Sequence, residues 1–442
     1  MVKGSPAGKI LAGLPFILLT LIWLITGCDG EATPTPAASA IAGITESPTA
    51  TVLAATPRAT TGEAAAGTAL PPPAQTRTAS ATPATPAPAD PDATYQLFLP
   101  AANSAGPTTT PTPSATFTPL PTPTPTIDFG QVRANLQAGG QELGFVKIGF
   151  HVGPGGNRNG LGIWMNRLDA AGVPFFLKSV DDSGALVEAQ NIMANSDVPH
   201  TLVYRKSGDA YDTPDYNLPP RDAAAQHWAL HMAAWPPELD PSRVWLETIN
   251  EVDKTRAAWL AEFALATAEF ALRDGYRWAA FGWASGEPEA VDWQSPAMLS
   301  FLRLVAANPD RLAIALHEYS YITDDIGHEY PFKVGRFQTL FAICDAQGIP
   351  RPTVLITEWG WEYQSIPDID KALQDIAWAA QLYAPYPEIR GAAIWYLGPG
   401  YNNIARATQR LINPVTEYAL GNYFPIPLPP AQAPIVPENY RP

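Results

Sequence analysis

Two glutamates in the sequence have the residue type and the setting for acid–base and nucleophilic chemistry. Glu251 follows the apolar stretch 244–249, directly after Asn250, and Glu358 lies near the end of the apolar stretch 353–359. Two carboxyl groups that face each other across a cleft can cleave a glycosidic bond, because one protonates the leaving oxygen while the other attacks the anomeric carbon. This chemistry requires the ends of the two stretches to lie next to the same cleft of the folded protein.

Apolar stretches typical of buried strands recur between residues 145 and 396, and segments with helical spacing follow them. We expect strands at 145–151, 174–180, 199–204, 244–249, 277–283, 312–319, 353–359 and 391–396. We expect helices at 161–171, 255–273, 296–307, 334–347 and 369–382, and also after the second and third strands. Buried strands joined through helices pair in parallel, so eight such units predict an α/β fold of the (β/α)8 or TIM-barrel type.

The alternative fold is an open, doubly wound sheet with a nucleotide site. No Gly-x-Gly-x-x-Gly follows the first expected strand, and residues 153–156 lack the Gly-Lys-Ser/Thr of a phosphate loop. In a barrel, active sites use the C-terminal ends of the strands, which is where Glu251 and Glu358 fall. His151 ends the first strand, so it is a candidate for binding the sugar in a neighbouring subsite.

The strand ends resemble the clan of retaining (β/α)8 glycoside hydrolases that contains the family 5 cellulases and mannanases and the family 39 xylosidases. In that clan an Asn-Glu pair ends strand four and a Glu ends strand seven. Asn250, Glu251 and Glu358 match these positions. The resemblance implies that Glu251 is the acid/base, that Glu358 is the nucleophile, and that Asn250 hydrogen-bonds the sugar 2-hydroxyl.

Two further elements carry the resemblance. His317 and Tyr319 resemble the His-x-Tyr at strand six of family 5, where the Tyr hydrogen-bonds the nucleophile, and Trp395 on strand eight stands where the clan has its platform under the cleaved sugar. Two elements depart from it: no arginine ends strand two, where Lys178 is the nearest cation, and Asn250 does not lie in the longer family 5 pattern beyond Asn-Glu. The particular family, and with it the sugar, therefore stays open.

No cofactor and no metal are expected. His227 and His231 are four residues apart, the spacing of a zinc-protease helix. Such a helix needs a glutamate directly after the first histidine as its general base, and Trp228 stands there instead. Metal binding at this pair is not favoured.

The net charge and the cysteine content limit the kinds of ligand and covalent cross-link that we expect. The chain of 442 residues has a net charge of -15, most of it in the second half, which argues against nucleic acid as a ligand. Of its 2 cysteines, Cys28 lies at the N-terminus and Cys344 in the expected barrel, so we expect no intrachain disulfide. The expected partner is a carbohydrate substrate, and the expected state is a monomer.

The N-terminus predicts export. Lys3 and Lys9 precede an apolar run at 10–25, so residues 1–27 are expected to be a signal peptide. Residues 25–28 resemble the lipobox of bacterial lipoproteins, which implies lipidation of Cys28 and anchoring on the extracytoplasmic face of a bacterial cell membrane. An uncleaved membrane helix is the alternative, because the run is close to the roughly 20 residues that span a bilayer.

Three more segments follow the signal peptide. Residues 28–127 are dominated by Pro, Thr and Ala and cannot bury enough apolar surface to fold, so we expect a disordered stalk. Residues 128–424 should form the catalytic barrel, and residues 425–442 a proline-rich tail.

Two other classes of function remain open at this stage. One is a barrel without catalysis that binds carbohydrate at the cell surface. The other is a structural cell-envelope protein in which the stalk is the functional part. The pair of glutamates favours an enzyme, because a binding module has no need for two carboxylates at one mouth.

Overall fold

The computed structural model describes residues 127–322 and 325–428 of the chain. The predicted signal peptide, the predicted lipidation site Cys28, residues 28–126 of the predicted stalk and residues 429–442 of the predicted tail lie outside the described residues. Within the described part, no helix combines the length and the apolar character that crossing a membrane requires. The barrel predicted at 128–424 falls almost wholly within the two described stretches.

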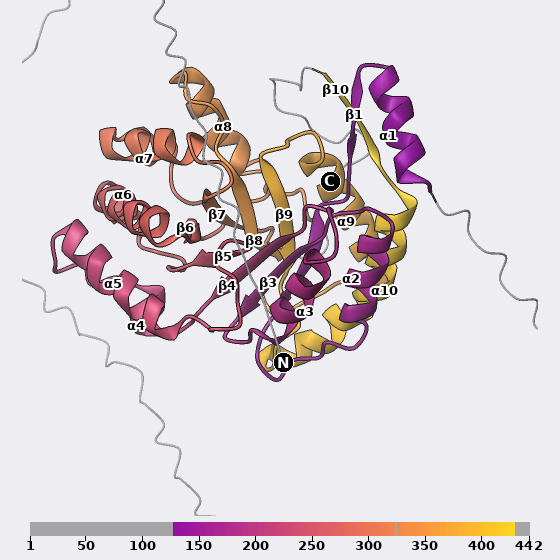
Figure 1. The fold of residues 1–442 in the computed structure, drawn as a ribbon, viewed down its shortest axis with the longest axis horizontal. Helices are drawn as coiled ribbons and strands as arrows, with labels where there is room; N and C mark the ends of the chain where they lie inside the picture. Colours follow the sequence, from indigo (N-terminus) through magenta and orange to yellow (C-terminus); the bar gives the residue numbers. More distant parts are fainter. Residues whose placement is uncertain (1–126, 323–324, 429–442) are drawn as a thin grey trace, which may run out of the picture. The chain divides into compact units, whose positions relative to one another are not determined.

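Eight parallel strands pair in sequence order and close on themselves, because the first, β2, pairs with both β3 and β9 (Figure 1). The strands are β2 (Ile148–Val152), β3 (Phe176–Val180), β4 (Thr201–Arg205), β5 (Val244–Glu247), β6 (Arg277–Trp283), β7 (Leu312–Tyr319), β8 (Val354–Gly360) and β9 (Ile389–Ile394). This confirms the predicted (β/α)8 barrel. The observed strands begin and end within three residues of the expected ones.

Helices cover the outside of the barrel (Figure 1). They are α2 (Leu161–Ala170), α3 (Gly184–Met193), α4 (Asp209–Asp212), α5 (Pro220–Ala234), α6 (Ala257–Asp274), α7 (Pro296–Ala306), α8 (Phe337–Ala346), α9 (Ile369–Tyr383) and α10 (Ile404–Gly421). In α6, Leu260, Ala261 and Ala264 are among the residues that one face buries, and the helix ends at Gly275, whose φ of 85° suits glycine. Cys344 in α8 is a free, buried thiol, and burial raises its pKa to about 12.

Apolar side chains fill the part of the barrel's interior that lies below the C-terminal ends of the strands. The cluster that we call the lower layer consists of Phe176, Val203, Trp245, Ala279, Ala313, Ala315, Leu355 and Ala393. Glycine at two positions makes room for Phe176, because a Cβ at Gly149 would overlap the Phe176 backbone carbonyl and a Cβ at Gly391 would overlap the Phe176 side chain. The interior is therefore a packed core and not a pore.

Two features of the fold were not predicted. The helix after the eighth strand, α10, contains Pro414, and it packs beside α2 and α9. Before the barrel, α1 (Phe129–Ala138) leads into β1 (Gln141–Gly144), which pairs antiparallel with β10 (Phe424–Pro427). The first residues of the predicted tail thus form a strand that joins the two ends of the described chain.

Candidate active site

Polar side chains occupy the barrel interior next to the lower layer, on the side of the strands' C-terminal ends. Side chains of a strand alternate between its two faces, so the residue two places after each inward apolar residue also points inward. These residues, which we call the upper layer, are Lys178, Arg205, Glu247, His317 and Thr357, and each is buried. They lie at the C-terminal ends of β3, β4, β5, β7 and β8, directly below the mouth.

Glu358 reaches the mouth because β8 departs from strict alternation. The pairing of β8 with β7 jumps from Ile356 to Glu358, and its pairing with β9 shifts in the same segment. Such a bulge redirects a side chain. The Glu358 carboxylate accepts a hydrogen bond of 2.7 Å from the Tyr319 hydroxyl, and it lies 3.4 Å from Lys178 Nζ and 3.6 Å from an Arg205 nitrogen.

Glu251 stands opposite, in the loop after β5. Its backbone has a φ of 46°, and its amide donates to the Gly282 carbonyl at 2.8 Å. Its side chain is 46% exposed, and one carboxylate oxygen lies 3.1 Å from His317 Nδ1. One oxygen each of Glu251 and Glu358 and one nitrogen of His317 lie within 4.8 Å of one another. The two carboxylates that the sequence singled out thus face each other at the mouth.

The charges around Glu358 fix its ionisation. Burial disfavours a carboxylate, but His317, Lys178 and Arg205 outweigh this and hold the pKa of Glu358 well below its usual range. Burial likewise opposes a charged His317, yet the carboxylates of Glu358, Glu247 and Glu251 raise the pKa of His317 to about 9. At neutral pH the site contains an ionised Glu358 beside a protonated His317.

Two adjoining pockets open at the mouth, with volumes of about 360 and 410 Å³. The smaller is lined by Glu251, Tyr319 and Glu358, and the larger by His151. They share the lining residues Arg205, Asn250, Trp395 and Tyr401. The cleft therefore continues from the two glutamates toward the first three strands.

The remaining predicted residues line this cleft. Trp395 follows β9, and its ring stacks on Tyr363 with centroids 5.8 Å apart, which widens the flat apolar surface. Asn250 Oδ1 is buried without a hydrogen-bond partner among the described residues, and so are both ring nitrogens of His151. Burial and the charge of Lys178 hold the pKa of His151 well below its usual range, so His151 is neutral. Asn250 Oδ1 and one ring nitrogen of His151 can accept hydrogen bonds from a ligand, and the other ring nitrogen of the neutral imidazole can donate one.

The sequence did not reveal all of the site. Arg205 and Glu247 were not singled out, and Lys178 was noted only as the nearest cation. A signal existed for Glu247, because a charged residue two places after Trp245 in a buried strand must be paired inside the barrel. Trp283 in β6 and Trp359 in β8 are both fully buried in the core.

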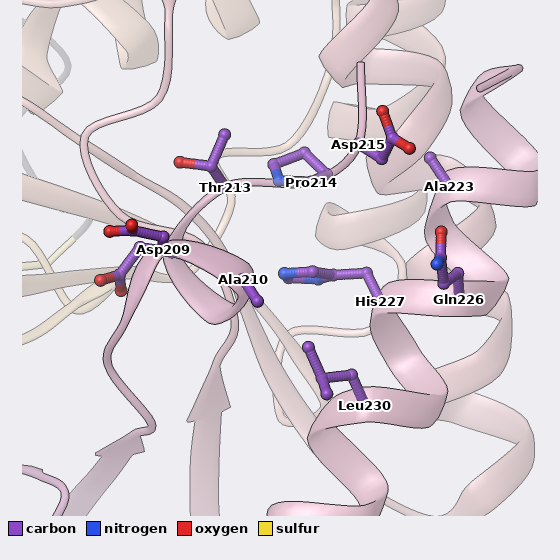
Figure 2. Close-up of a pocket in the computed structure, with 10 residues that line it drawn as sticks. Asp209, Ala210, Thr213, Pro214, Asp215, Ala223, Gln226, His227 and Leu230 are labelled. Atoms are coloured by element: carbon purple, nitrogen blue, oxygen red, sulfur yellow. The ribbon is translucent and has the colours of Figure 1, made fainter. Parts of the chain in front are cut away.

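His227 and His231, for which the sequence did not favour metal binding, lie away from the mouth. His227 and His231 lie on α5, and Nε2 of each contacts the Tyr211 carbonyl, at 2.9 and 3.3 Å. Figure 2 shows His227 in a pocket of about 660 Å³ between α4 and α5. Within the described part of the chain, Glu251, His317 and Glu358 form a group with metal-ligand geometry, but the nearby cations Lys178 and Arg205 already pair with Glu358.

The fold and the mouth define a (β/α)8 barrel with a pair of facing carboxylates. No family model and no curated protein match the sequence. Among solved structures, the chain is similar to a family 5 xyloglucanase from Paenibacillus pabuli, with 14% identity, a TM-score of 0.38, and coverage of 62% of this chain and 98% of that chain. It is also similar to Cel5A (EG2) from Hypocrea jecorina, with 15% identity, a TM-score of 0.32, and coverage of 57% and 89%.

A third solved structure is an exo-β-1,4-mannosidase from Opitutaceae bacterium strain TAV5, with 14% identity, a TM-score of 0.32, and coverage of 64% of this chain and 61% of that chain. At such identities and TM-scores these likenesses assign no role to any residue. The barrel itself is defined by the pairing of its own strands.

Proposed function

We propose that this protein hydrolyses β-linked glycosides or polysaccharides with retention of the anomeric configuration. The observation that carries the proposal is the approach of the Glu251 and Glu358 carboxylates to within 4.8 Å at the barrel mouth. Retaining glycosidases have carboxyl groups about 5–5.5 Å apart, whereas inverting enzymes need about 6.5–9.5 Å to admit a water. The spacing supports direct attack by one carboxylate.

The two glutamates have different roles in this reaction. Glu358, held ionised by its cationic neighbours, attacks the anomeric carbon, and Glu251 gives a proton to the departing oxygen. The aglycone leaves as an alcohol, and the sugar remains as an ester of Glu358. Glu251 then takes a proton from a water that attacks the same carbon, which releases the sugar and restores both carboxyl groups.

The cleft supplies the contacts for the sugar. Trp395 provides an apolar surface for a sugar face, and the unpaired Oδ1 of Asn250 accepts a hydrogen bond from the 2-hydroxyl. His151 binds the hydroxyls of the next sugar in the adjoining pocket. Tyr319 and His317 orient Glu358 and Glu251. The reaction requires no cofactor.

An activity screen that also identifies the anomer of the product tests the proposed function. The protein is assayed on aryl β-glycosides, β-glucan, mannan and xylan, and proton nuclear magnetic resonance identifies the anomer that forms first. We expect the β-anomer first. An α-anomer as first product would refute retention, and binding of these glycans with no turnover on any of them would favour the non-catalytic carbohydrate-binding barrel.

We also propose that the protein is a monomer anchored through a lipid on Cys28 to the extracytoplasmic face of a bacterial cell membrane. The proposal is supported by Lys3, Lys9, the apolar run 10–25 and the lipobox-like residues 25–28. Labelled palmitate fed to expressing cells should mark the parent and not the Cys28→Ser variant. Equal labelling of both proteins would refute the anchor.

A further inference from the structure

Below the mouth lies a buried ion pair of Lys178 and Glu247, of which the reaction above uses only Lys178, as one of the cations that keep Glu358 ionised. Lys178 Nζ and Glu247 Oε2 are 2.9 Å apart, and both side chains are 0% exposed. Neither residue belongs to the lining of the two mouth pockets, so neither reaches a substrate there. Burying two charges costs several kcal/mol per ion, and a well-packed apolar pair is often as stable. The pair therefore calls for an explanation other than stability.

Glu247 is held firmly in place. The Thr357 hydroxyl donates to Glu247 Oε1 at 3.2 Å, and Lys178 holds the other carboxylate oxygen. On a third side, a Cβ added to Gly282 would lie 2.8 Å from Glu247 Oε1, so only glycine leaves the carboxylate room there. The charge of Glu247 is thereby fixed at one point below the mouth.

That point lies against the ring of His317. Glu247 Oε1 is 3.8 Å from His317 Nε2, a contact between charges and too long for a hydrogen bond. The other ring nitrogen, Nδ1, lies 3.1 Å from Glu251 and 3.7 Å from Glu358. One imidazole thus stands between three carboxylates, and the positive charge of Lys178 opposes its protonation.

We propose that Glu247 is a positioning residue that keeps His317 protonated between the two catalytic carboxylates and thereby sets the alkaline limit of the site. Its action on the reaction rests on the proposed function. Protonated His317 donates from Nδ1 toward Glu251 and stabilises the ionised Glu358. When His317 loses its proton, both contacts weaken together.

The ionisation states fit this role. Burial opposes the Glu247 carboxylate, but Lys178 and the neighbouring cations lower the pKa of Glu247 to about 2, so its charge persists across the working range. The pKa of His317 is about 9 because Glu358, Glu247 and Glu251 together outweigh burial and Lys178. Removing the charge of Glu247 must therefore lower the pKa of His317.

The direct test is the titration of His317 by nitrogen-15 nuclear magnetic resonance. Its signals, among those of 6 histidines, are assigned by their loss in His317→Gln. We expect a midpoint near 9 in the parent and one lower by about one unit or more in Glu247→Gln. A parent midpoint at or below the ordinary value of 6.5, or an unchanged midpoint in the variant, would overturn the proposal.

Two controls separate charge from packing. Thr357→Val removes the hydrogen bond to Glu247 but keeps the carboxylate, and Glu417→Gln neutralises an exposed glutamate that pairs with Arg167. Both should leave the His317 midpoint within about 0.3 units of the parent, the scale of a minor electrostatic change. If Glu247→Gln does not fold, the parent midpoint and Glu247→Asp, which keeps the charge but shortens the side chain, decide the question.

The second test measures the pH dependence of kcat/KM for the same variants. In Glu247→Gln, the alkaline limb of kcat/KM should move to lower pH by the same amount as the His317 midpoint, with kcat changing and KM within about twofold. A limb that stays in place while the midpoint moves would overturn the role in the reaction. A protein inactive on every glycoside would refute the proposed function, while the nuclear magnetic resonance titration would still decide the role of Glu247.

Discussion

The lower and upper layers of the barrel interior lie on the same strands but do different work. Trp245 and Glu247 are two residues apart on β5, and Leu355 and Thr357 are two apart on β8. The lower residues belong to an apolar cluster, whereas the upper ones belong to a network of charges and hydrogen bonds. One step of strand alternation thus separates packing from chemistry.

The difference between the layers is energetic as well as chemical. The lower layer gains free energy in proportion to the apolar area that it removes from water, about 25 cal/mol per Å². The upper layer loses solvation energy, so its charges must be paired: Lys178 with Glu247, and Arg205 with Asp212 at 2.5 Å. A substitution in the lower layer should therefore cost stability, and one at the mouth should cost turnover.

Glu358→Ala should have the largest effect of all. Without this carboxylate no glycosyl ester can form, so we expect kcat to fall on the order of 10⁴-fold or more. Thermal melting should change far less than turnover, because Lys178 and Arg205 keep Glu247 and Asp212 as partners. Assays of kcat and thermal melts on one preparation check both; near-parent activity would show that Glu358 is not the nucleophile.

Glu251→Ala should have a smaller effect that depends on the leaving group. Loss of a general acid costs about 10²–10⁴-fold on natural glycosides, whereas an activated phenolate departs without protonation. We therefore expect aryl β-glycosides with good leaving groups to keep far more activity than β-linked oligosaccharides. The ratio of kcat/KM for the two substrate types measures this. Equal losses on both types would contradict the acid role of Glu251.

Trp245→Ala should give the opposite pattern, a loss of stability with little loss of turnover. Removing a large ring that is 3% exposed leaves a cavity and costs about 3–5 kcal/mol. For a domain of this size we expect the melting temperature to fall by roughly 10 °C. Activity per folded molecule at 25 °C should stay within about twofold. A loss of activity comparable to that of Glu358→Ala would show that the two layers are not separable.

Much of the fold could be predicted from the sequence because buried strands and amphipathic helices leave periodic patterns. The strands at 277–283 and 312–319 were predicted residue for residue. The helix α10 was missed because Pro414 lies inside it, and proline normally breaks a helix. The pairing of β1 with β10 joins segments almost 300 residues apart, and no local pattern records such a contact.

The site was predictable only where chemistry and strand ends coincide. Glu251 and Glu358 could be found because Glu358 lies near the C-terminal end of a buried strand and Glu251 lies shortly after another, and the barrel brings strand ends together. The bulge that turns Glu358 into the mouth depends on the register with β7 and β9, which sequence does not encode locally. Arg205 was missed because Glu358 becomes its neighbour only when the barrel closes, and Asp212 becomes its neighbour only through the turn of the chain between β4 and α4.

The smallest effect, and the finest test of the comparison, is the pH dependence of stability. The pKa of His317 is raised from 6.5 to about 9, so its stabilising contribution is complete below pH 6.5 and is lost as the pH rises through 9. Relative to the parent, His317→Gln should be destabilised by about 3 kcal/mol at pH 6 and by much less near pH 10. Trp245→Ala should show a penalty that does not change between these pH values, because an apolar cavity binds no proton.

Urea unfolding of the parent and both variants at pH 6, 8 and 10 measures the two trends. A constant penalty for His317→Gln would mean that His317 is neutral and takes no part in the network of charges that distinguishes the upper layer from the lower one.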